Sequence, residues 1–373
     1  MSSDLKVEII TDFERLESLT PDWERLWGLS PRREVFGTWG WARASWRAFG
    51  EDRKLSTLVV RRAGDIVGIW PLVLNKSRLQ PLSTPHSDYN DLLCDQRDAQ
   101  EVLGAVIAVL RAKPFSWKKG VVENIPEGGN LIQGALGLIG ARKPGLYLTV
   151  GSICSTIVFE GNEDFVGARV LGNKHLRRKE KRLSSLGEIG FHHLEDQAEI
   201  RELLPDFFRQ HVERRALLGE RSMFCAEREC FFYRCLVDEF DPRSVLRFGV
   251  LRLNGKPIGY HLGFEIDRKL TSYKPTFEAR LAKWSPGEVV FKKVFEYVAE
   301  RGLRECDLTV GLEEFKNRFA NLMSRNWTLF FYPPGTRGYL GLKSEQTKNW
   351  VLRHKTLYRT LKSLQRSLFH NRR

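Results

Sequence analysis

The sequence lacks the features that mark exported or membrane-spanning proteins. Its longest apolar runs, such as residues 102–110, are far shorter than the ~20 residues that cross a bilayer. Residues 1–19 carry charge throughout and include no apolar core of the kind found in a signal peptide. We therefore expect a cytoplasmic protein.

Cysteine is scarce, and its spacing argues against a disulfide framework or a metal site. The six cysteines, none of which forms a Cys-x-x-Cys pair, are Cys94, Cys154, Cys225, Cys230, Cys235 and Cys306. A disulfide framework is not expected in a chain of this length without an export signal. We expect reduced thiols and no bound metal.

Acidic residues are too few to balance the basic ones. The chain has 60 Lys and Arg against 46 Asp and Glu, which gives a formal net charge of +14. The excess of basic residues is concentrated in two segments, 174–182 and 348–373. The second segment includes no acidic residue. This balance favours an anionic partner, such as a phosphate-bearing cofactor, a nucleic acid or an anionic membrane surface, but it also fits plain solubility.

Length and periodicity predict two domains. The chain has 373 residues, of which 42% are apolar, enough for a sizeable core. In the first half the patterns predict helices over 10–29, 36–49, 99–111 and 132–138, and strands over 55–60, 66–74, 91–94 and 121–124. No residue-level repeat links this half to the second.

The pattern restarts near residue 152. Strands are expected over 156–159, 189–193, 246–253, 256–265, 269–276, 305–309 and 328–332, and helices over 163–186, 200–215, 227–240 and 288–301. The fold class expected is α/β (α+β): two lobes, 1–150 and 151–340, each a mixed, mainly antiparallel sheet flanked by helices. A basic amphipathic helix over 341–373 follows.

The most informative segment is 246–319, where a three-stranded meander leads into a strong helix. The turn between them is Trp284, Ser285, Pro286 and Gly287. The free N–H groups and positive dipole end of a helix start bind anions, and glycine permits close approach. Ser285 and Glu288 also fit a capping box, which is ordinary at a helix start, so both interpretations stay open.

An ordered series of segments carries a family resemblance. In the second half these are LRFGVLRLNGKPIGYHLGFEIDRKLTSYKPTFE, KWSPGEVVFKKVFEYVAERGL and CDLTVGLEEFKNRF; upstream they are GTWGWARASWRAFG, GDIVGIWPLVL, PHSDYNDLL and GNKHLRRKEKRLSSLGEIGF. Over residues 10–335 the series resembles the CelD/BcsL-type acetyltransferases, a GNAT-like family named for a member linked to cellulose biosynthesis. That family is related to the Fem-type aminoacyltransferases, which place two GNAT domains side by side and use aminoacyl-tRNA.

The resemblance implies two tandem GNAT-like domains and transfer of an acetyl or other acyl group from acyl-CoA to an amine or hydroxyl. GNAT enzymes bind the coenzyme A pyrophosphate at the turn before the helix that follows the central strands. Here that turn is 282–287, so Trp284, Ser285, Pro286 and Gly287 become the implied cofactor-binding residues. The usual pattern R/Q-x-x-G-x-G/A is met only by Arg280 and one late glycine. Aminoacyl-tRNA therefore stays open as the donor.

Acyl transfer needs a neutral nucleophile, a stabilised oxyanion and a proton acceptor. The candidate acceptors are His261 in mid-strand, Glu278 at a strand end beside the presumed cofactor turn, and Asp307. Asp307 begins an apolar strand, where a carboxylate lines a cleft or pairs with a cation. Each has a plain alternative: a packed histidine, a solvated glutamate and a structural ion pair.

Three further features complete the candidate site. Lys316 lies in the segment FKNRF, which resembles a Fem-type segment whose lysine contacts substrate; an exposed lysine is the alternative. Asp88 and Tyr89 belong to a polar, aromatic cluster before a strand, and with Tyr273 at the end of the meander we assign them to acceptor binding. A simple turn is the competing interpretation of Asp88 and Tyr89.

The basic clusters have several possible partners. On one helix they comprise Lys174, Arg177, Arg178, Lys181 and Arg182. This face fits a polyphosphate, a tRNA backbone or a lipid head group, or is simply solvated. The apolar residues of the tail helix, spaced among its basic ones, are Trp350, Leu357, Leu361, Leu364 and Leu368. That pattern suits an anionic membrane surface or packing on the protein itself.

We therefore expect an acyl-CoA-dependent N- or O-acyltransferase with a saccharide or small-molecule acceptor, acting in polysaccharide or cell-envelope metabolism. The alternatives are a Fem-like aminoacyl-tRNA-dependent transferase and a non-catalytic GNAT-like protein that binds nucleic acid or membrane. The +14 charge and the weak coenzyme A pattern favour the Fem-like transferase, and the charge and the absence of a clean catalytic dyad favour the non-catalytic protein.

Overall fold

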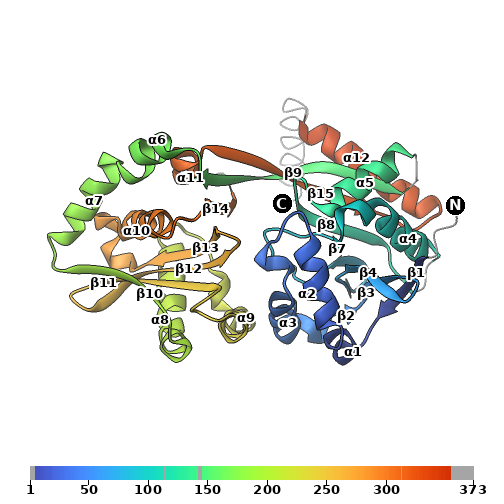
Figure 1. Ribbon diagram of the computed structural model, residues 1–373, viewed down its shortest axis with the longest axis horizontal. Coiled ribbons are helices and arrows are strands. Elements are labelled where there is room, and N and C mark those ends of the chain that lie inside the picture. The colour runs from blue at the N-terminus through green and yellow to red at the C-terminus, as the bar shows by residue number, and fades with distance from the viewer. Residues whose placement is uncertain (1–4, 113–114, 142–144, 312, 354–373) are drawn as a thin grey trace, which may run out of the picture.

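The computed structural model describes residues 5–112, 115–141, 145–311 and 313–353. Two lobes lie side by side and are joined by long strands (Figure 1). The first lobe contains helices α1 (Phe13–Glu17), α2 (Thr20–Leu29), α3 (Trp39–Phe49), α4 (Ala99–Arg111) and α5 (Asn130–Gly140). Its strands are β1 (Leu5–Ile10), β2 (Lys54–Leu55), β3 (Thr57–Arg62), β4 (Asp65–Trp70), β5 (Leu72–Asn75), β6 (Arg78–Pro81), β7 (Leu93–Cys94), β8 (Lys119–Pro126) and β9 (Leu146–Val158).

The second lobe is built around a sheet with helices on both faces. Its strands are β10 (Ile189–Leu194), β11 (Leu246–Leu253), β12 (Lys256–Ile266), β13 (Lys269–Phe277) and β14 (Glu305–Val310). Its helices are α6 (Glu163–Phe165), α7 (Lys174–Ser184), α8 (Gln197–Ala216), α9 (Glu227–Glu239), α10 (Pro286–Glu300) and α11 (Glu314–Phe319). In Figure 1, α7 and α10 lie on one side of the sheet, and α8 and α9 on the other.

The sheets of the two lobes are continuous. Eleven strands follow the order β10-β11-β12-β13-β14-β9-β15-β8-β6-β5-β2, and a separate sheet follows β1-β3-β4-β7. Most pairs are antiparallel; β13–β14 and β6–β8 are parallel. The expected mixed, mainly antiparallel sheets flanked by helices are confirmed.

Strands β9 and β15 (Leu322–Phe331) connect the lobes, because they pair along most of their length. The expected boundary at residue 150 lies inside β9, and β15 returns from the second half to pair with β8 of the first. The last described helix, α12 (Thr336–Arg353), packs against β9 and places Glu345 beside Lys119.

An aromatic core crosses the boundary between the halves. Trp41 of α3 is fully buried, and its ring lies 5.5 Å from that of Phe264 and 5.4 Å from that of Tyr273. Helices α3 and α9 also pack together. Burying each large apolar side chain contributes about 1.5–3 kcal/mol, so this contact fixes the lobes relative to each other.

The local sequence explains the two hairpin turns of the meander formed by β11, β12 and β13, as expected. Asn254 and Gly255 have φ of 48° and 78°, which a two-residue hairpin turn between twisted strands requires. Asp267 and Arg268 form the second hairpin in the same left-handed region, with φ of 50° and 61°.

The helix predicted over 163–186 is wrong as a single element. The chain passes from α6 through a π-helical segment, Val166–Leu171, and starts α7 afresh. Asn173 begins α7 because its side chain accepts hydrogen bonds from the backbone N–H groups of His175 and Leu176.

All six cysteines are free thiols; five are buried and Cys225 is exposed. Within the described residues, no group of His, Cys, Asp and Glu side chains is arranged to hold a metal ion. None of the described helices is both long and apolar enough to span a membrane.

Candidate functional site

Strands β13 and β14 pair briefly and then separate. Three parallel pairs join them, Lys269 with Glu305, Leu270 with Cys306, and Thr271 with Asp307. Both strands then become irregular: the register of β12 on β13 shifts after Leu262, and that of β14 on β9 shifts after Asp307. A sheet that opens in this way leaves backbone groups free to face a ligand.

A cavity of about 660 Å³ lies at this opening. Its walls include residues 272–275 of β13, 308–310 of β14, and side chains of α8, α10 and α11. Asp88 is contributed by the first half of the chain. The volume is in the range of small-molecule sites.

The cavity is strongly cationic. The Lys and Arg residues among its described walls are Arg214, Arg215, Arg221, Lys274 and Lys316, whereas the acids are Asp88 and Glu313. The ring of His211 also lines it and shares a hydrogen bond of 2.8 Å with Ser222 Oγ. Burial, then the charges of Arg214 and Lys274, lower the pKa of His211 to about 3, so this imidazole is neutral near pH 7.

The cavity residues of α8 were missed by the sequence reasoning. His211, Arg214 and Arg215 have the i, i+3, i+4 spacing that places side chains on one helix face. That spacing was the available signal. It is weak by itself, because a solvated helix face shows it equally often.

Lys316, one of the predicted catalytic residues, lies in the cavity wall. It is 6% exposed, and its Nζ donates a 2.7 Å hydrogen bond to the carbonyl of Val310. It also pairs with Glu313 at 3.1 Å. Gly311, with φ of 137°, lets the chain pass close to this ammonium.

Asp307 lies behind the cavity wall. It is 2% exposed, and its Oδ1 accepts hydrogen bonds from Tyr89 Oη at 3.0 Å and from the N–H of Thr309 at 2.8 Å. Burial raises the pKa of Asp307 to about 6, against the lowering effect of Lys269, which itself pairs with the buried Glu34. Of its two sequence interpretations, the carboxylate that belongs to a buried ionic cluster fits the geometry.

Of the three residues predicted to bind the acceptor, two line the cavity and one does not. Asp88 and Tyr273 line the cavity, and Tyr273 Oη donates to the carbonyl of His86 at 2.8 Å. Tyr89 is not among the described residues that line the cavity, and its hydroxyl donates to Asp307 instead.

His261 reaches the cavity only through a neighbour. It is fully buried, and its Nε2 lies 2.9 Å from Oγ of Ser272, which lines the cavity. Burial, then the neighbouring His193, lower the pKa of His261 to about 3. Such a histidine is a poor proton acceptor near pH 7.

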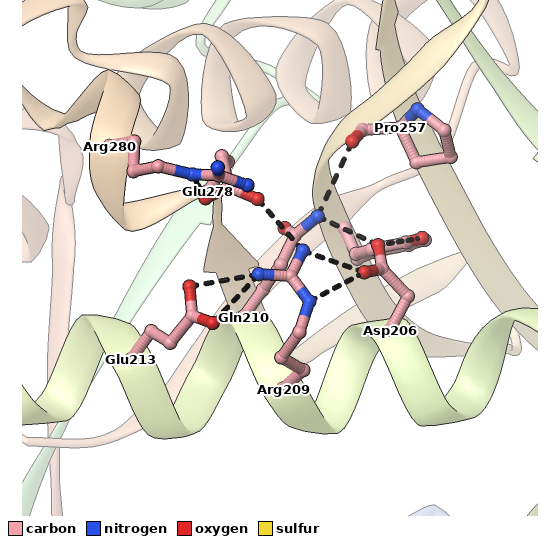
Figure 2. Close-up of polar contacts among 8 residues, drawn as sticks. Asp206, Arg209, Gln210, Glu213, Pro257, Glu278 and Arg280 are labelled. Carbon is pink, nitrogen blue, oxygen red and sulfur yellow. Dashed lines mark hydrogen bonds and ion pairs between the residues drawn. The ribbon is translucent and has the colours of Figure 1, made fainter.

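Glu278 is held in a network of ion pairs rather than presented to the cavity. Arg209 of α8 extends toward Asp206, Glu213 and Glu278 (Figure 2), and its Nη2 lies 2.8 Å from Glu278 Oε2. Arg280 donates to the other carboxylate oxygen at 3.0 Å. Burial alone would raise the pKa of Glu278, but these two guanidinium groups hold it below its usual value.

Close packing inside the protein accounts for the glycine of the predicted cofactor turn. A Cβ at Gly287 would lie 2.8 Å from the ring of Phe277, closer than atoms pack. Ser285 is left-handed, with φ of 59°, and Trp284 packs beneath the guanidinium of Arg182 at 4.9 Å. Pro286 occupies the first turn of α10, as expected from helix grammar.

The capping box proposed for this turn is wrong. The Ser285 side chain caps no N–H group; it accepts from Lys179 Nζ at 3.0 Å. Glu288 pairs with Arg318 at 2.9 Å and lies 3.3 Å from His175. The negative charge favoured at the start of α10 is thus supplied by Glu288 of the protein itself.

The basic helix α7 packs against this turn. Lys179 and Arg182 contact it, as described, while Lys174, Arg177, Arg178 and Lys181 are exposed. The tail residues Leu357, Leu361, Leu364 and Leu368 lie outside the described residues, and Trp350 is 55% exposed on α12.

Comparison with known proteins finds a family similarity in the second lobe. Residues 172–317 match the family described as acetyltransferase (GNAT) domain. The match makes this segment similar to GNAT acetyltransferase domains. The matched segment runs from α7 into α11, and it therefore contains both strands that separate at the cavity.

Solved structures extend the fold similarity to both lobes. FemX is 10% identical with a TM-score of 0.59, over 88% of this chain and 97% of that one. L-PGS from Bacillus licheniformis is 11% identical with a TM-score of 0.55, over 87% and 93%. A tandem GNAT protein from the clavulanic acid biosynthesis pathway is 14% identical with a TM-score of 0.53, over 89% and 100%. These identities support a shared fold alone, and no curated protein sequence matches the chain.

Proposed function

We propose that this protein is an acyltransferase that brings an acyl donor and an amine or hydroxyl acceptor together in the cavity between β13 and β14. The observation that carries the proposal is the position of the cavity. It lies where β13 and β14, two strands of the segment similar to GNAT domains, separate, an opening at which unpaired backbone N–H groups can meet a ligand. Such groups stabilise the oxyanion of an acyl-transfer intermediate.

The charges of the cavity suit an amine nucleophile. Nearby cations lower the pKa of a bound amine, which favours the neutral form that attacks a carbonyl. A strongly basic side chain is then unnecessary. This agrees with the low pKa of His211 and the ion-paired state of Glu278.

Lys316 is the side chain we assign to electrostatic stabilisation of the developing oxyanion. It is buried in the cavity wall and points to the end of β14. Lys316→Met should lower turnover on the order of a hundredfold while changing substrate affinity much less. Equal losses in a matched Lys256→Met variant, whose lysine is exposed and lies outside the cavity, would refute this role.

We propose acyl-CoA as the donor, supported by the GNAT match. One observation favours aminoacyl-tRNA as the second candidate: Glu288 occupies the start of α10, where GNAT enzymes place a pyrophosphate. The exposed basic residues of α7 beside it suit a nucleic-acid backbone. Isothermal titration with acetyl-CoA, free coenzyme A, uncharged tRNA and aminoacyl-tRNA separates the two donors.

For the acceptor we propose a saccharide or other small molecule of polysaccharide or cell-envelope metabolism, supported by the resemblance to the CelD/BcsL-type family. Thioester consumption in the presence of amino sugars and polysaccharide fragments tests it. A non-catalytic protein would bind donor without consuming it.

A peripheral position on the inner face of the membrane belongs to the same proposal and rests on the basic tail. A chain ending at residue 353 keeps α12 and its contact with Lys119 but removes the remaining basic residues. It should bind anionic vesicles less than the full chain does, in a salt-dependent way. Equal binding by both chains would contradict the proposal.

A further inference from the structure

One wall of the cavity carries positive charge that the protein leaves unbalanced. The α8 side contributes Arg214 and Arg215, and β13 contributes Lys274 between Tyr273 and Pro275. Of these three, Arg215 has a carboxylate partner, Glu220, at 2.8 Å. The Nε atoms of Arg214 and Arg215 are buried without a hydrogen bond.

Lys274 is the centre of this group. Its ammonium lies 4.3 Å from the ring centre of Tyr273, and no residue in the described part of the chain accepts a hydrogen bond from it. Burial lowers the pKa of Lys274, which Asp88 raises and Lys316 and Arg215 lower again. Lys274 is partly buried, and a cation in that position without a hydrogen-bond acceptor costs some stability, which the negative charge of a ligand would offset.

Arg214 likewise forms no ion pair with a carboxylate of the described residues. Its guanidinium lies 5.8 Å from the ring centre of Phe277. Burial, and then the charge of Arg215, lower the pKa of Arg214, whereas the charge of Glu220 raises it. Lys274 and Arg214 thus both line the cavity beside an aromatic ring, and neither forms an ion pair with a carboxylate of the described residues. Such cations suit an anionic ligand better than a structural ion pair.

We propose that Lys274, Arg214 and Arg215 bind a phosphate group of the acceptor substrate. A phosphate carries up to two negative charges and three strong acceptor oxygens, which matches three converging cations better than one carboxylate does. The inference deepens the proposed function and rests on it: the molecule that receives the acyl group is a phosphorylated compound, held by its phosphate on the α8 side of the cavity.

Two sources supply such a group, a soluble sugar phosphate and a phospholipid head group. The mouth of the cavity bears on the choice, because Leu218 lines the cavity and is 64% exposed, and Leu217 is 60% exposed. Exposed leucines beside basic residues insert readily into an anionic lipid surface. The shared chemistry is the phosphate, and the test separates the two sources.

The experiment measures binding of glucose 1-phosphate by titration, and of phosphatidylglycerol vesicles against phosphatidylcholine vesicles by co-sedimentation, at fixed ionic strength. The proteins are the wild type, Lys274→Met, Arg214→Gln and the control Lys256→Met, all as full chains. Loss of a charge-assisted hydrogen bond weakens binding by roughly tenfold to a hundredfold. That loss is expected for Lys274→Met and Arg214→Gln, and not for Lys256→Met.

A thermal melt adds a signature that a merely structural lysine would not give. Without ligand, Lys274→Met should melt above the wild type, because it removes a partly buried cation that has no hydrogen-bond acceptor among the described residues. The phosphate compound that binds should raise the melting temperature of the wild type and leave that of Lys274→Met unchanged.

The outcomes are distinct. The proposal is overturned if the wild type binds neither phosphate probe, or if both cavity variants bind them as the wild type does. It is also overturned if Lys274→Met loses affinity for acetyl-CoA alone, since the cations then serve the donor. If the wild type binds the phosphate probes but no acyl donor, the proposed function fails while the phosphate site is supported.

Discussion

Tyr89 Oη donates a hydrogen bond to Oδ1 of Asp307 across 3.0 Å, and thereby ties the first half of the chain to β14 of the second. The same Oδ1 accepts from the N–H of Thr309, a β-branched residue in the left-handed region with φ of 59°. Thr309 lines the cavity. Asp307 is thus placed to hold a strained segment of the cavity wall, and we assign it positioning rather than proton transfer.

Tyr89→Phe should destabilise the protein by about 1–3 kcal/mol, because the buried Asp307 loses one of the two hydrogen-bond donors that the described residues give it. Urea denaturation measures the change. Tyr147→Phe is the matched control, since Tyr147 is only partly buried and stacks on Phe330 through its ring. Equal stabilities of the two variants would show that the bond to Asp307 contributes nothing.

Glu278→Gln should reduce stability more than turnover. Its carboxylate joins Arg209 and Arg280 at the end of β13, and the amide cannot replace both charge-assisted bonds (Figure 2). We expect a loss of about 1–3 kcal/mol and less than a tenfold change in turnover. A variant of normal stability whose turnover falls more than a hundredfold would restore Glu278 as the general base.

Gly287→Ala should destabilise the protein by about 1–3 kcal/mol, because its Cβ would meet the Phe277 ring at 2.8 Å. Gly140→Ala is the control, since nothing lies within 4 Å of a Cβ there. Thermal melts and acetyl-CoA titration are both needed. If Gly287→Ala keeps its stability and loses acetyl-CoA affinity, the turn binds the donor as the resemblance implies.

Two buried histidines should make stability fall as the pH drops below about 6.5, and two aspartates should offset that fall below about pH 6. Burial lowers the pKa of His211 and of His261 to about 3, so the unfolded chain binds protons that the folded chain refuses. Each histidine lowers the free energy of unfolding by about 1.4 kcal/mol per pH unit as the pH falls from about 6.5 towards 3. Asp91 and Asp307 oppose it between about pH 6 and 4, because burial raises their pKa to about 6 and the folded state then binds the extra proton.

Denaturation of His211→Gln at pH 7.5, 6, 5 and 4 tests whether His211 makes the protein less stable as the pH falls. The variant should depend less steeply on pH than the wild type, whereas the exposed-residue control His192→Gln should follow the wild type. A steeper dependence for His211→Gln would mean that the folded protein binds a proton at His211.

The parts of the fold that follow from neighbouring residues were predictable. Asn254-Gly255 fixes a hairpin through its own backbone preference, and the apolar spacing of residues 99–111 gives α4 its observed limits. The pairing of β9 with β15 was not predictable in this way, because the two strands lie more than 150 residues apart.

In the candidate site, too, the features set by neighbouring residues were predictable and those that depend on distant residues were not. Lys316 was identified from a local pattern, whereas the cavity that gives it a role also depends on His211, Arg214 and Lys274 from other elements. The spacing of side chains on α8 cannot show which face of the helix meets the opening between β13 and β14. Asp307 had two sequence interpretations, and only the contacts with Tyr89 and Thr309 distinguish them.

The most direct test of the account is a crystal structure of the protein soaked with acetyl-CoA. The account predicts the thioester between residues 272–275 of β13 and 308–310 of β14, within reach of Lys316 and facing the cationic wall of α8. A thioester bound outside this opening, or a cavity filled by side chains in the complex, would contradict it.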